Sequence, residues 1–461
     1  MSETTEKVSV DPEQQQVKLP PTPERISVEV GDTDEDVSTS IPPLAPEGGV
    51  QGWMAVLGCW CALFYTFGYV TSFGYCILPF QTLESPGPSL IVLDSVYEEF
   101  YLQNTLRHKS ASDIAWIGSI QTFSQFSATI ISGPICDRYG PRVVIWPFSV
   151  TLVASLMLTS ICKEYYQFLL CQGVLFGMSS GLIYAPAIAV VGHYFHRKRP
   201  MAMSVASTGS TMGGIIIPVV LTRLLNRSSL GFGWTQRIVG FLGMCLAIAA
   251  CMTIRPGVKP RKGTWLLPKA FLDPAYSLQV VGLFLIIWGM WTPFFYLSTY
   301  GLEHGMSSQL ATYLVALLNA GSLVGRMIGG ILSLRAGQFN VVVAACFASA
   351  ILIFSWLHIT STAGIIALTI LYGATSGAII ALMIATLGQV APHPNQIGTY
   401  IGMASGSFGL AGLTGTPITG AMISRYGGYS QAIIFSGSVV MAGSFLMLWA
   451  RFSYAKGRLI V

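Results

Sequence analysis

One arginine is embedded in a long apolar stretch of the chain, where a charge is expensive. The stretch covers about residues 308–331, and Arg326 is the only formally charged residue in any predicted helix core. A guanidinium at the centre of a membrane helix costs at least ~2.5–3.5 kcal/mol and should have a partner. Because no Asp or Glu lies in a predicted helix core, we predict that Arg326 binds the carboxylate of a substrate as a bidentate pair. The alternative is that its side chain snorkels to the cytoplasmic surface, since the helix ends near Ile331.

Further polar and aromatic residues are candidates for the same substrate pathway. Asn319, Ser322 and Arg326 are spaced i, i+3 and i+7, so they form one polar stripe on a helix. Six more candidates lie on other predicted helices: Gln121, Gln125, Tyr65, Tyr184, Trp288 and Trp291. Packing is the commoner role of aromatic residues at such positions and is the alternative for the last four.

The composition requires a membrane around these residues. Of 461 residues, 52% are hydrophobic and only 10% are charged, whereas a soluble domain has about 25% charged residues. Twelve apolar stretches approach the ~20 residues that a spanning helix needs. They lie near 53–74, 113–134, 143–162, 166–191, 201–222, 234–254, 275–298, 308–331, 340–359, 363–388, 397–423 and 429–450. The predicted fold is therefore an all-α membrane protein with twelve transmembrane helices.

Charge placement predicts the orientation. Residues 1–46 are acidic and rich in proline, which predicts a disordered tail. After the tail, the loops on its side of the membrane carry twice as many Lys and Arg residues as the loops on the other side, so both termini are predicted to be cytoplasmic. We expect a multi-pass protein of the plasma membrane.

An internal repeat divides the helices six and six. Gly133, Arg138 and Gly140 recur as Gly330, Arg335 and Gly337 at a constant offset, and two further anchors recur at nearly the same offset. Two pseudo-symmetric six-helix halves with a site between them are typical of secondary transporters. The predicted organisation is a tail at 1–46, a first bundle at 47–254, a cytoplasmic linker at 255–274, a second bundle at 275–451 and a short tail at 452–461.

A glycine-rich turn between the second and third predicted helices carries charges that could latch neighbouring helix ends. The latch candidates are Gly133, Asp137, Arg138, Gly140 and Arg142. This turn resembles the loop signature of the major facilitator superfamily. In the second copy Leu334 replaces Asp137, so a carboxylate latch is confined to the first half.

Other segments resemble the monocarboxylate porter family within that superfamily, especially its fungal branch. They are Pro46–Trp53, Tyr194–Ala202, Asp113–Gln121, Gly305–Ser307 and Asn319–Arg326. The resemblance implies that Arg326 is a substrate-binding position. The proton-coupled animal members carry a lysine and an acidic residue where this chain has Thr71 and Ser322, which puts their proton relay in doubt here. Exchange, uniport and proton movement on the substrate itself are the open alternatives. We also expect Arg197, Lys198 and Arg199 to bind anionic lipid headgroups.

One segment departs from the family pattern. Members usually pass directly from the first helix into a segment like Val96–Tyr101, whereas Tyr75–Ser95 intervenes here. We interpret it as an insertion, with a retained intron as a specific version of that hypothesis.

These observations predict a secondary transporter that moves a small monocarboxylate-like organic anion by alternating access. Nine scattered cysteines and the absence of nucleotide-binding or hydrolase motifs predict no metal, no cofactor and no enzymatic activity. The expected partners are the substrate, the bilayer and a proton as a candidate coupling ion, with no nucleic acid, and the chain is expected to act as a monomer. The alternatives are an exporter of a hydrophobic secondary metabolite, an importer of a neutral vitamin, and a nutrient sensor with a transporter fold.

Overall fold

The computed structural model describes residues 47–71, 101, 106, 108, 111–227, 231–258 and 265–460. These residues belong to one compact unit, Ala45–Val461. The predicted tail at 1–46 and the predicted insertion Tyr75–Ser95 lie outside the described residues.

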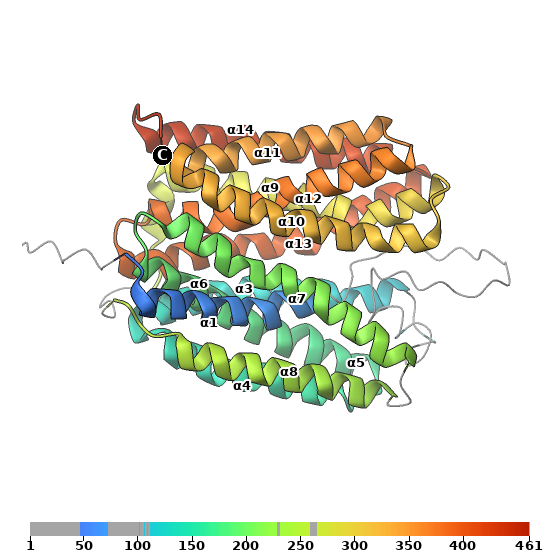
Figure 1. Ribbon diagram of the computed structural model, residues 1–461, viewed down its shortest axis with the longest axis horizontal. Coiled ribbons are helices and arrows are strands. Elements are labelled where there is room, and N and C mark those ends of the chain that lie inside the picture. The colour runs from blue at the N-terminus through green and yellow to red at the C-terminus, as the bar shows by residue number, and fades with distance from the viewer. Residues whose placement is uncertain are drawn as a thin grey trace, which may run out of the picture. The chain divides into compact units, whose positions relative to one another are not determined.

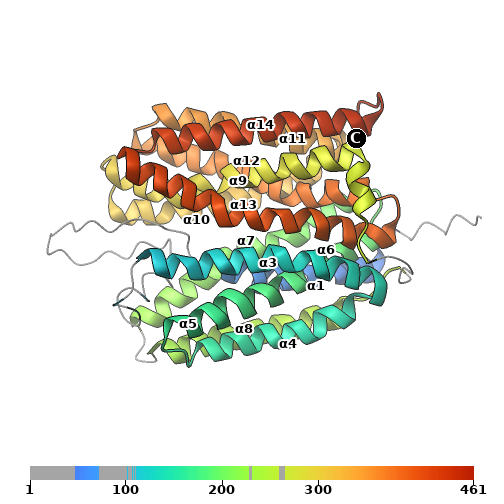
Figure 2. The same cartoon turned by 180° about the vertical axis from the view of Figure 1, so that it is seen from behind.

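The described residues form helices and contain no strand. The first group is α1 (Gly49–Val70), α3 (Ala111–Tyr139), α4 (Pro141–Thr159), α5 (Tyr165–Phe168), the π-helix η2 (Leu169–Phe176), α6 (Gly177–Tyr194), α7 (Arg199–Arg227) and α8 (Gly231–Thr253). The second group is η3 (Pro268–Leu272), α9 (Pro274–Glu303), α10 (Ser308–Ala336), α11 (Gln338–Ser355), η4 (Trp356–His358), α12 (Thr362–Val390), η5 (Pro394–Gln396), α13 (Ile397–Tyr426) and α14 (Ser430–Ala455). Figures 1 and 2 show the two groups from opposite sides.

The all-helical fold confirms the predicted fold class, and each predicted stretch falls on a long helix or on the continuous run from α5 to α6. Ten of the described helical runs are long and apolar enough to cross a membrane. The helices α3 and α13 are not among these ten. Their glycine, serine and threonine residues face each other: a Cβ on Gly133 would lie 2.1 Å from the carbonyl oxygen of Gly398. Small residues allow the two helix backbones to pack closely. Because these residues are less apolar than leucine or isoleucine, they also lower the mean hydropathy of both helices.

Small residues also set the packing within each half. A Cβ on Gly325 of α10 would lie 1.9 Å from the carbonyl oxygen of Ala374 in α12. A Cβ on Gly209 of α7 would lie 2.2 Å from the carbonyl oxygen of Trp60 in α1. A side chain at either glycine would push the helices apart. The absence of a side chain therefore allows α10 to pack closely on α12, and α7 on α1.

The helix ends define two poles of the bundle. We call the pole where α1 and α7 begin and where α3 and α6 end the basic end. The described basic residues at this end are Arg138, Arg142, Arg197, Lys198, Arg199, Arg255, Lys269, Arg335, Arg451, Lys456 and Arg458. The pole where α1 and α7 end is the opposite end, and its described basic residues are Lys163, Arg223, Arg237 and Arg425 together with Arg227, at which α7 ends.

Contacts between the two groups are concentrated toward the basic end. The helix α3 lies along α13, and α7 lies along α10. The Thr129 hydroxyl of α3 donates to the carbonyl oxygen of Gly402 in α13 at 3.2 Å, and a Cβ on Gly330 of α10 would lie 2.6 Å from the Ser204 Cβ of α7. In Figure 1, α7 and α10 separate toward the opposite end. The structure therefore represents a conformation in which the halves meet at the basic end.

Candidate functional site: a central cavity with one buried arginine

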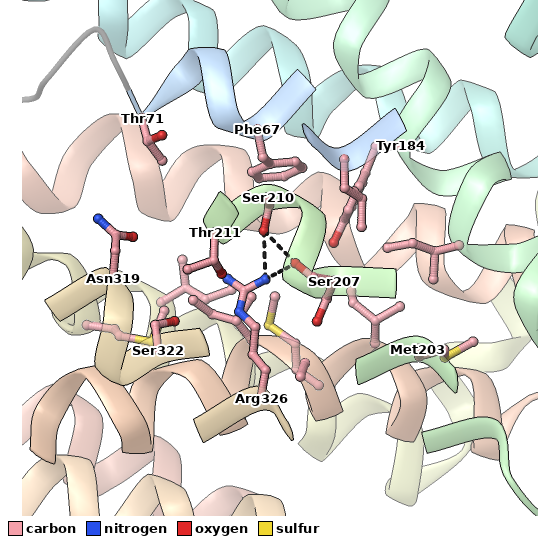
Figure 3. Close-up of a pocket in the computed structure, with 18 of the residues that line it drawn as sticks. Phe67, Thr71, Tyr184, Met203, Ser207, Ser210, Thr211, Asn319, Ser322 and Arg326 are labelled. Atoms are coloured by element: carbon pink, nitrogen blue, oxygen red, sulfur yellow. Dashed lines mark hydrogen bonds between the residues drawn. The ribbon is translucent and has the colours of Figure 1, made fainter. Parts of the chain in front are cut away.

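A cavity lies between the two halves and receives side chains from both, which we call the central cavity. Its apolar lining consists of Leu63, Phe67, Phe126, Ile188, Met203, Ile287, Met290, Trp291, Phe294, Ile380, Ala381, Met383 and Ile384. Its polar lining consists of Thr71, Tyr184, Ser207, Ser210, Thr211, Asn319, Ser322 and Arg326. The polar groups gather mostly on α7 and α10, so the cavity has a predominantly apolar wall and one polar strip (Figure 3).

Arg326 lies in this polar strip and is 5% exposed. One terminal nitrogen of its guanidinium donates to the backbone carbonyl of Ser207 and, at 2.6 Å, to the hydroxyl of Ser210, both on α7 (Figure 3). The Nε atom is buried without a hydrogen-bond partner. The side chain thus reaches across to the other half and does not extend to the surface of the basic end.

The remaining polar groups of the strip leave hydrogen-bonding capacity around this guanidinium. Among the described residues no carboxylate pairs with Arg326, and the buried hydroxyl of Thr211 also has no partner. The Asn319 amide donates to the carbonyl oxygen of Val315 at 3.1 Å within its own helix. An unsatisfied buried polar group costs about 1–3 kcal/mol. A bound molecule that satisfied Arg326 and Thr211 would recover part of that cost.

Five of the nine candidate substrate residues line the central cavity: Arg326, Asn319, Ser322, Tyr184 and Trp291. These come from three different helices, α6, α9 and α10, so the fold brings together residues that are up to 142 positions apart, from 184 to 326.

The other four candidates lie away from the cavity lining. The Tyr65 hydroxyl shares a hydrogen bond of 3.1 Å with Ser149 of α4, and the Trp288 ring packs edge-on against Phe435 at 5.5 Å between centroids. Gln121 and Gln125 are fully buried, and neither side-chain amide has a hydrogen-bond partner. All four are on helices that contribute to the cavity, but they occupy other faces of those helices.

The polar face of α7 is the part of the site that sequence reasoning missed. Ser207, Ser210 and Thr211 all line the cavity opposite Arg326. Their spacing forms a polar stripe that the sequence displays, but the same helix also carries a ridge of small residues. Nothing in the sequence says which of these faces meets α10.

Asp137 joins the two halves at the basic end. Its carboxylate accepts hydrogen bonds from the backbone amides of Gly398 and Thr399, at 3.2 and 2.7 Å, and from the Thr399 hydroxyl at 2.7 Å. It therefore caps the N-terminus of α13, where a negative charge is favoured by the exposed amides and by the helix dipole. Gly133, one turn earlier, provides the close approach of α3 to α13.

The other latch candidates lie on the last turn of α3, on the turn after it and on the first turn of α4. The Arg138 guanidinium lies over the ring of Trp265, 5.4 Å from its centroid. Gly140 has φ 89° and forms the turn between α3 and α4, a conformation that favours glycine. Arg142 is exposed on the first turn of α4. No hydrogen bond or ion pair given for Gly140 or Arg142 in the described part of the chain bridges the halves.

Arg199 corrects one prediction. We expected it to bind lipid headgroups, but it is 8% exposed. Its guanidinium donates to the carbonyl oxygens of Gly388 in α12 at 3.0 Å and of Gly192 in α6 at 3.3 Å. Because the C-terminal carbonyls of helices carry partial negative charge, a buried cation is favoured there. Arg199 is therefore a second charged link between the halves at the basic end.

Two of the signature segments meet in space. The backbone amides of Arg197 and Lys198 donate to the carboxylate of Glu47, the latter at 3.3 Å. The amide of Gly48 donates to the carbonyl oxygen of Tyr194 at 3.1 Å. Glu47–Trp53 and Tyr194–Ala202 thus form one junction, in which the Glu47 carboxylate binds the two backbone amides just before α7.

Known proteins share this architecture and sequence. A sequence model of the Major Facilitator Superfamily matches residues 56–393. The aspyridones efflux protein of Emericella nidulans is 41% identical over 92% of this chain and 83% of its own length. The agnestins efflux protein of Paecilomyces divaricatus is 35% identical over 96% of both chains.

Solved structures agree on the fold. The human organic anion transporter MFSD10 (TETRAN) superposes with a TM-score of 0.65 at 15% identity, over 86% of this chain and 98% of that one. The transporter FucP in the outward conformation gives a TM-score of 0.63 at 15% identity over the same shares. These two relatives are named as efflux proteins and not as monocarboxylate porters. They support the predicted superfamily but not the predicted monocarboxylate porter family. This chain belongs to the Major Facilitator Superfamily and is a multi-pass membrane transporter.

Proposed function

We propose that this transporter exports an apolar secondary metabolite that carries an acidic group, with the central cavity as its binding site. The observation that carries the proposal is the composition of that cavity: an extensive apolar wall faces a strip with one incompletely paired guanidinium. The efflux proteins that are similar to this chain support the direction of transport. The proposed substrate is therefore that of the exporter alternative, a hydrophobic secondary metabolite, and not the small monocarboxylate that the sequence first predicted.

The apolar wall argues for a substrate larger than a small monocarboxylate. Each buried CH₂ group contributes about 0.8 kcal/mol, and aromatic and methionine side chains such as Phe67, Trp291 and Met290 line the wall. A small monocarboxylate would cover only the part of this surface next to Arg326. A molecule with an aromatic or aliphatic body would cover much more of it and bind correspondingly better.

The acidic group of the substrate would bind at the polar strip. Arg326 offers its free Nε, and the hydroxyls of Thr211 and Tyr184 lie in the same lining. A charge-assisted hydrogen bond contributes about 1.5–3 kcal/mol. Because no described carboxylate lines the cavity, we infer that any coupled proton travels on the acidic group of the substrate.

The same proposal includes the orientation and the transport cycle. In this proposal the protein lies in the plasma membrane. Its basic end faces the cytoplasm, in accord with the positive-inside rule. Asp137 and Arg199 hold this end closed, and their release opens the cavity to the cytoplasm, where the substrate enters. One chain supplies both walls of the cavity, so a monomer suffices.

The proposal can be tested in yeast cells that lack their own drug exporters. Cells that express the chain are loaded with a panel of aromatic and long-chain acids, their neutral analogues, and lactate, and retention is measured over time. We expect faster loss of the apolar acids, abolished by Ala381→Trp, which fills the cavity at a lining position. Unchanged retention of every apolar acid in cells with normal membrane expression would refute the proposal.

A small monocarboxylate is the second candidate, and Arg326 together with the resemblance of Asn319–Arg326 favours it. Loss of lactate from the same cells, with no effect on the larger acids, would select it. Export of a neutral compound that is insensitive to Arg326 substitution would instead leave the arginine with a structural role.

A further inference from the structure

A second hollow lies on the outside of the first half, between α4 and α8, and we call it the outer groove. Its lining is apolar and includes Trp146, Val150, Met244, Ile248 and Met252. We propose that the outer groove binds one anionic phospholipid, with an acyl chain in the groove and the headgroup on Arg142 and Arg255. This proposal does not rest on the proposed transport function.

The groove is formed by the parts of two spanning helices that the protein leaves uncovered. Both Pro141–Thr159 and Gly231–Thr253 are apolar enough to cross a membrane, and less than half of each apolar window is buried. Val150 is 70% exposed and Met252 is 66% exposed. In a bilayer such a surface must be covered by hydrocarbon. A concave surface holds a lipid chain with more contacts than a flat one does.

Each of the two helices that line the outer groove carries an arginine at the basic end of its row of groove residues. On α4, Arg142, Trp146 and Val150 are spaced i, i+4 and i+8. The corresponding stripe of α8 has Ile248 and Met252, with Arg255 just beyond the helix end. Residues at these spacings share one face of a helix. Because α4 begins and α8 ends at the basic end, both arginines are placed at the headgroup end of the groove.

Neither arginine makes a side-chain hydrogen bond or ion pair with a carboxylate among the described residues, and both are exposed. The described carboxylates near this end are engaged elsewhere: Asp137 caps α13, Glu47 binds the start of α7, and Asp273 caps α9. No carboxylate of the described part of the chain therefore neutralises this pair. Two guanidinium groups next to an apolar groove match a phosphodiester with a further negative charge better than they match a zwitterionic headgroup.

The floor of the groove connects it to the centre of the molecule. Ser149 lines the groove and shares a hydrogen bond of 3.1 Å with the Tyr65 hydroxyl of α1. The Cys251 thiol of α8 donates to the same Ser149 hydroxyl at 3.7 Å. The groove thus covers a junction of α1, α4 and α8, and α1 carries Phe67 of the central cavity. A lipid bound there would hold this junction together, so binding should raise the melting temperature.

The experiment uses the purified full chain in detergent, with native mass spectrometry and thermal unfolding as readouts. The ligands are phosphatidylserine, phosphatidylcholine with the same acyl chains, and glycerophosphoserine without chains. We expect one retained phosphatidylserine that raises the melting temperature. Phosphatidylcholine and glycerophosphoserine should each bind at least about tenfold more weakly, because one lacks the net charge and the other lacks the chain.

Variants separate the two parts of the site. Arg142→Gln with Arg255→Gln should weaken phosphatidylserine binding about tenfold, and Arg142→Lys with Arg255→Lys should retain most of it. Ala154→Phe fills the groove at an exposed lining position and should also weaken binding. Arg335→Gln with Lys456→Gln, at exposed positions of the basic end, is the matched control and should change nothing.

Three results would overturn the proposal. The first is equal retention of phosphatidylserine and phosphatidylcholine. The second is unchanged binding in the Arg142→Gln, Arg255→Gln variant while the control variant folds equally well. The third is a dimer in lipid-free detergent that Ala154→Phe dissociates, since the occupant of the groove would then be a second copy of the chain.

Discussion

At the scale of single residues, the proposed function assigns substrate binding chiefly to Arg326. Arg326→Gln removes the charge but keeps a polar side chain, and we expect it to lower the efflux of an apolar acid by about 10- to 100-fold, the value of 1.5–3 kcal/mol of charge-assisted hydrogen bonding. Efflux from loaded cells, normalised to the amount of protein in the membrane, measures the effect. Ser333→Ala is a suitable control, since within the described part of the chain that hydroxyl bonds to the Gly330 carbonyl of its own helix. Equal losses in both variants would contradict a specific role.

We propose that Asp137 helps to hold the basic end closed through its hydrogen bonds to the start of α13. Asp137→Asn keeps the size of the side chain but removes the charge at the start of α13, which is expected to weaken closure by about 0.5–2 kcal/mol. The neighbouring Cys136 is a free cysteine that is only 3% exposed, so labelling of its peptide by a water-soluble carbene reagent, which does not depend on ionisation of the thiol, reports opening. We expect labelling to rise by about 2- to 30-fold, measured by mass spectrometry of the Cys136 peptide.

Arg335→Gln is the matched control for this measurement. Arg335 occupies the place in the second copy of the repeat that Arg138 occupies in the first, and it is exposed. Its substitution should leave the carbene labelling of the Cys136 peptide unchanged. Increased labelling in the Arg335 variant, or unchanged labelling in the Asp137 variant, would contradict a role of Asp137 in closing this end.

At the scale of elements, the packing of α10 on α12 fixes the position of Arg326. Gly325→Ala adds one methyl group 1.9 Å from the Ala374 carbonyl oxygen. The resulting shift of α10 should cost about 1–3 kcal/mol and lower the melting temperature of the purified protein. Gly428→Ala, at a position with nothing within 4 Å, should have no effect. Equal melting temperatures for the two variants would show that α10 does not pack as described.

The sequence predicts the helices well because burial in a membrane leaves a strong compositional signal. It predicts less about α3 and α13: both are among the predicted helices, but their close approach at Gly133 and Gly398 depends on tertiary packing. The π-helix η2 has no signal in the sequence, since apolar residues fill most of that run.

The site was predictable only in part for a related reason. A lone charge such as Arg326 stands out in any apolar helix, whatever its neighbours. Which face of a helix meets which partner depends on the tertiary packing. Tyr65 and Trp288 therefore occupy other faces, while Ser207 and Thr211 line the cavity unpredicted.

At the scale of the whole molecule, the proposed transport cycle requires the halves to separate at the basic end. Ser204→Cys with Gly330→Cys places two thiols on α7 and α10. A Cβ at position 330 would lie 2.6 Å from the Ser204 Cβ, and a disulfide needs about 3.8 Å between these atoms, so a small local shift allows the bond. Oxidation should stop efflux, and reduction should restore it to the level of the single variants. Undiminished efflux by the cross-linked protein would exclude alternating access through this end.

Binding of an acidic substrate by Arg326 is tested most sharply by combining one change in the protein with one in the substrate. Flux of an apolar acid and of its methyl ester is measured in proteoliposomes that contain either the natural chain or Arg326→Gln. We predict that the natural chain prefers the acid by about tenfold or more, and that the preference disappears in the variant because the ester and the glutamine remove the same ion pair. An equal preference for the acid in both proteins would contradict the claim that Arg326 binds the acidic group of the substrate.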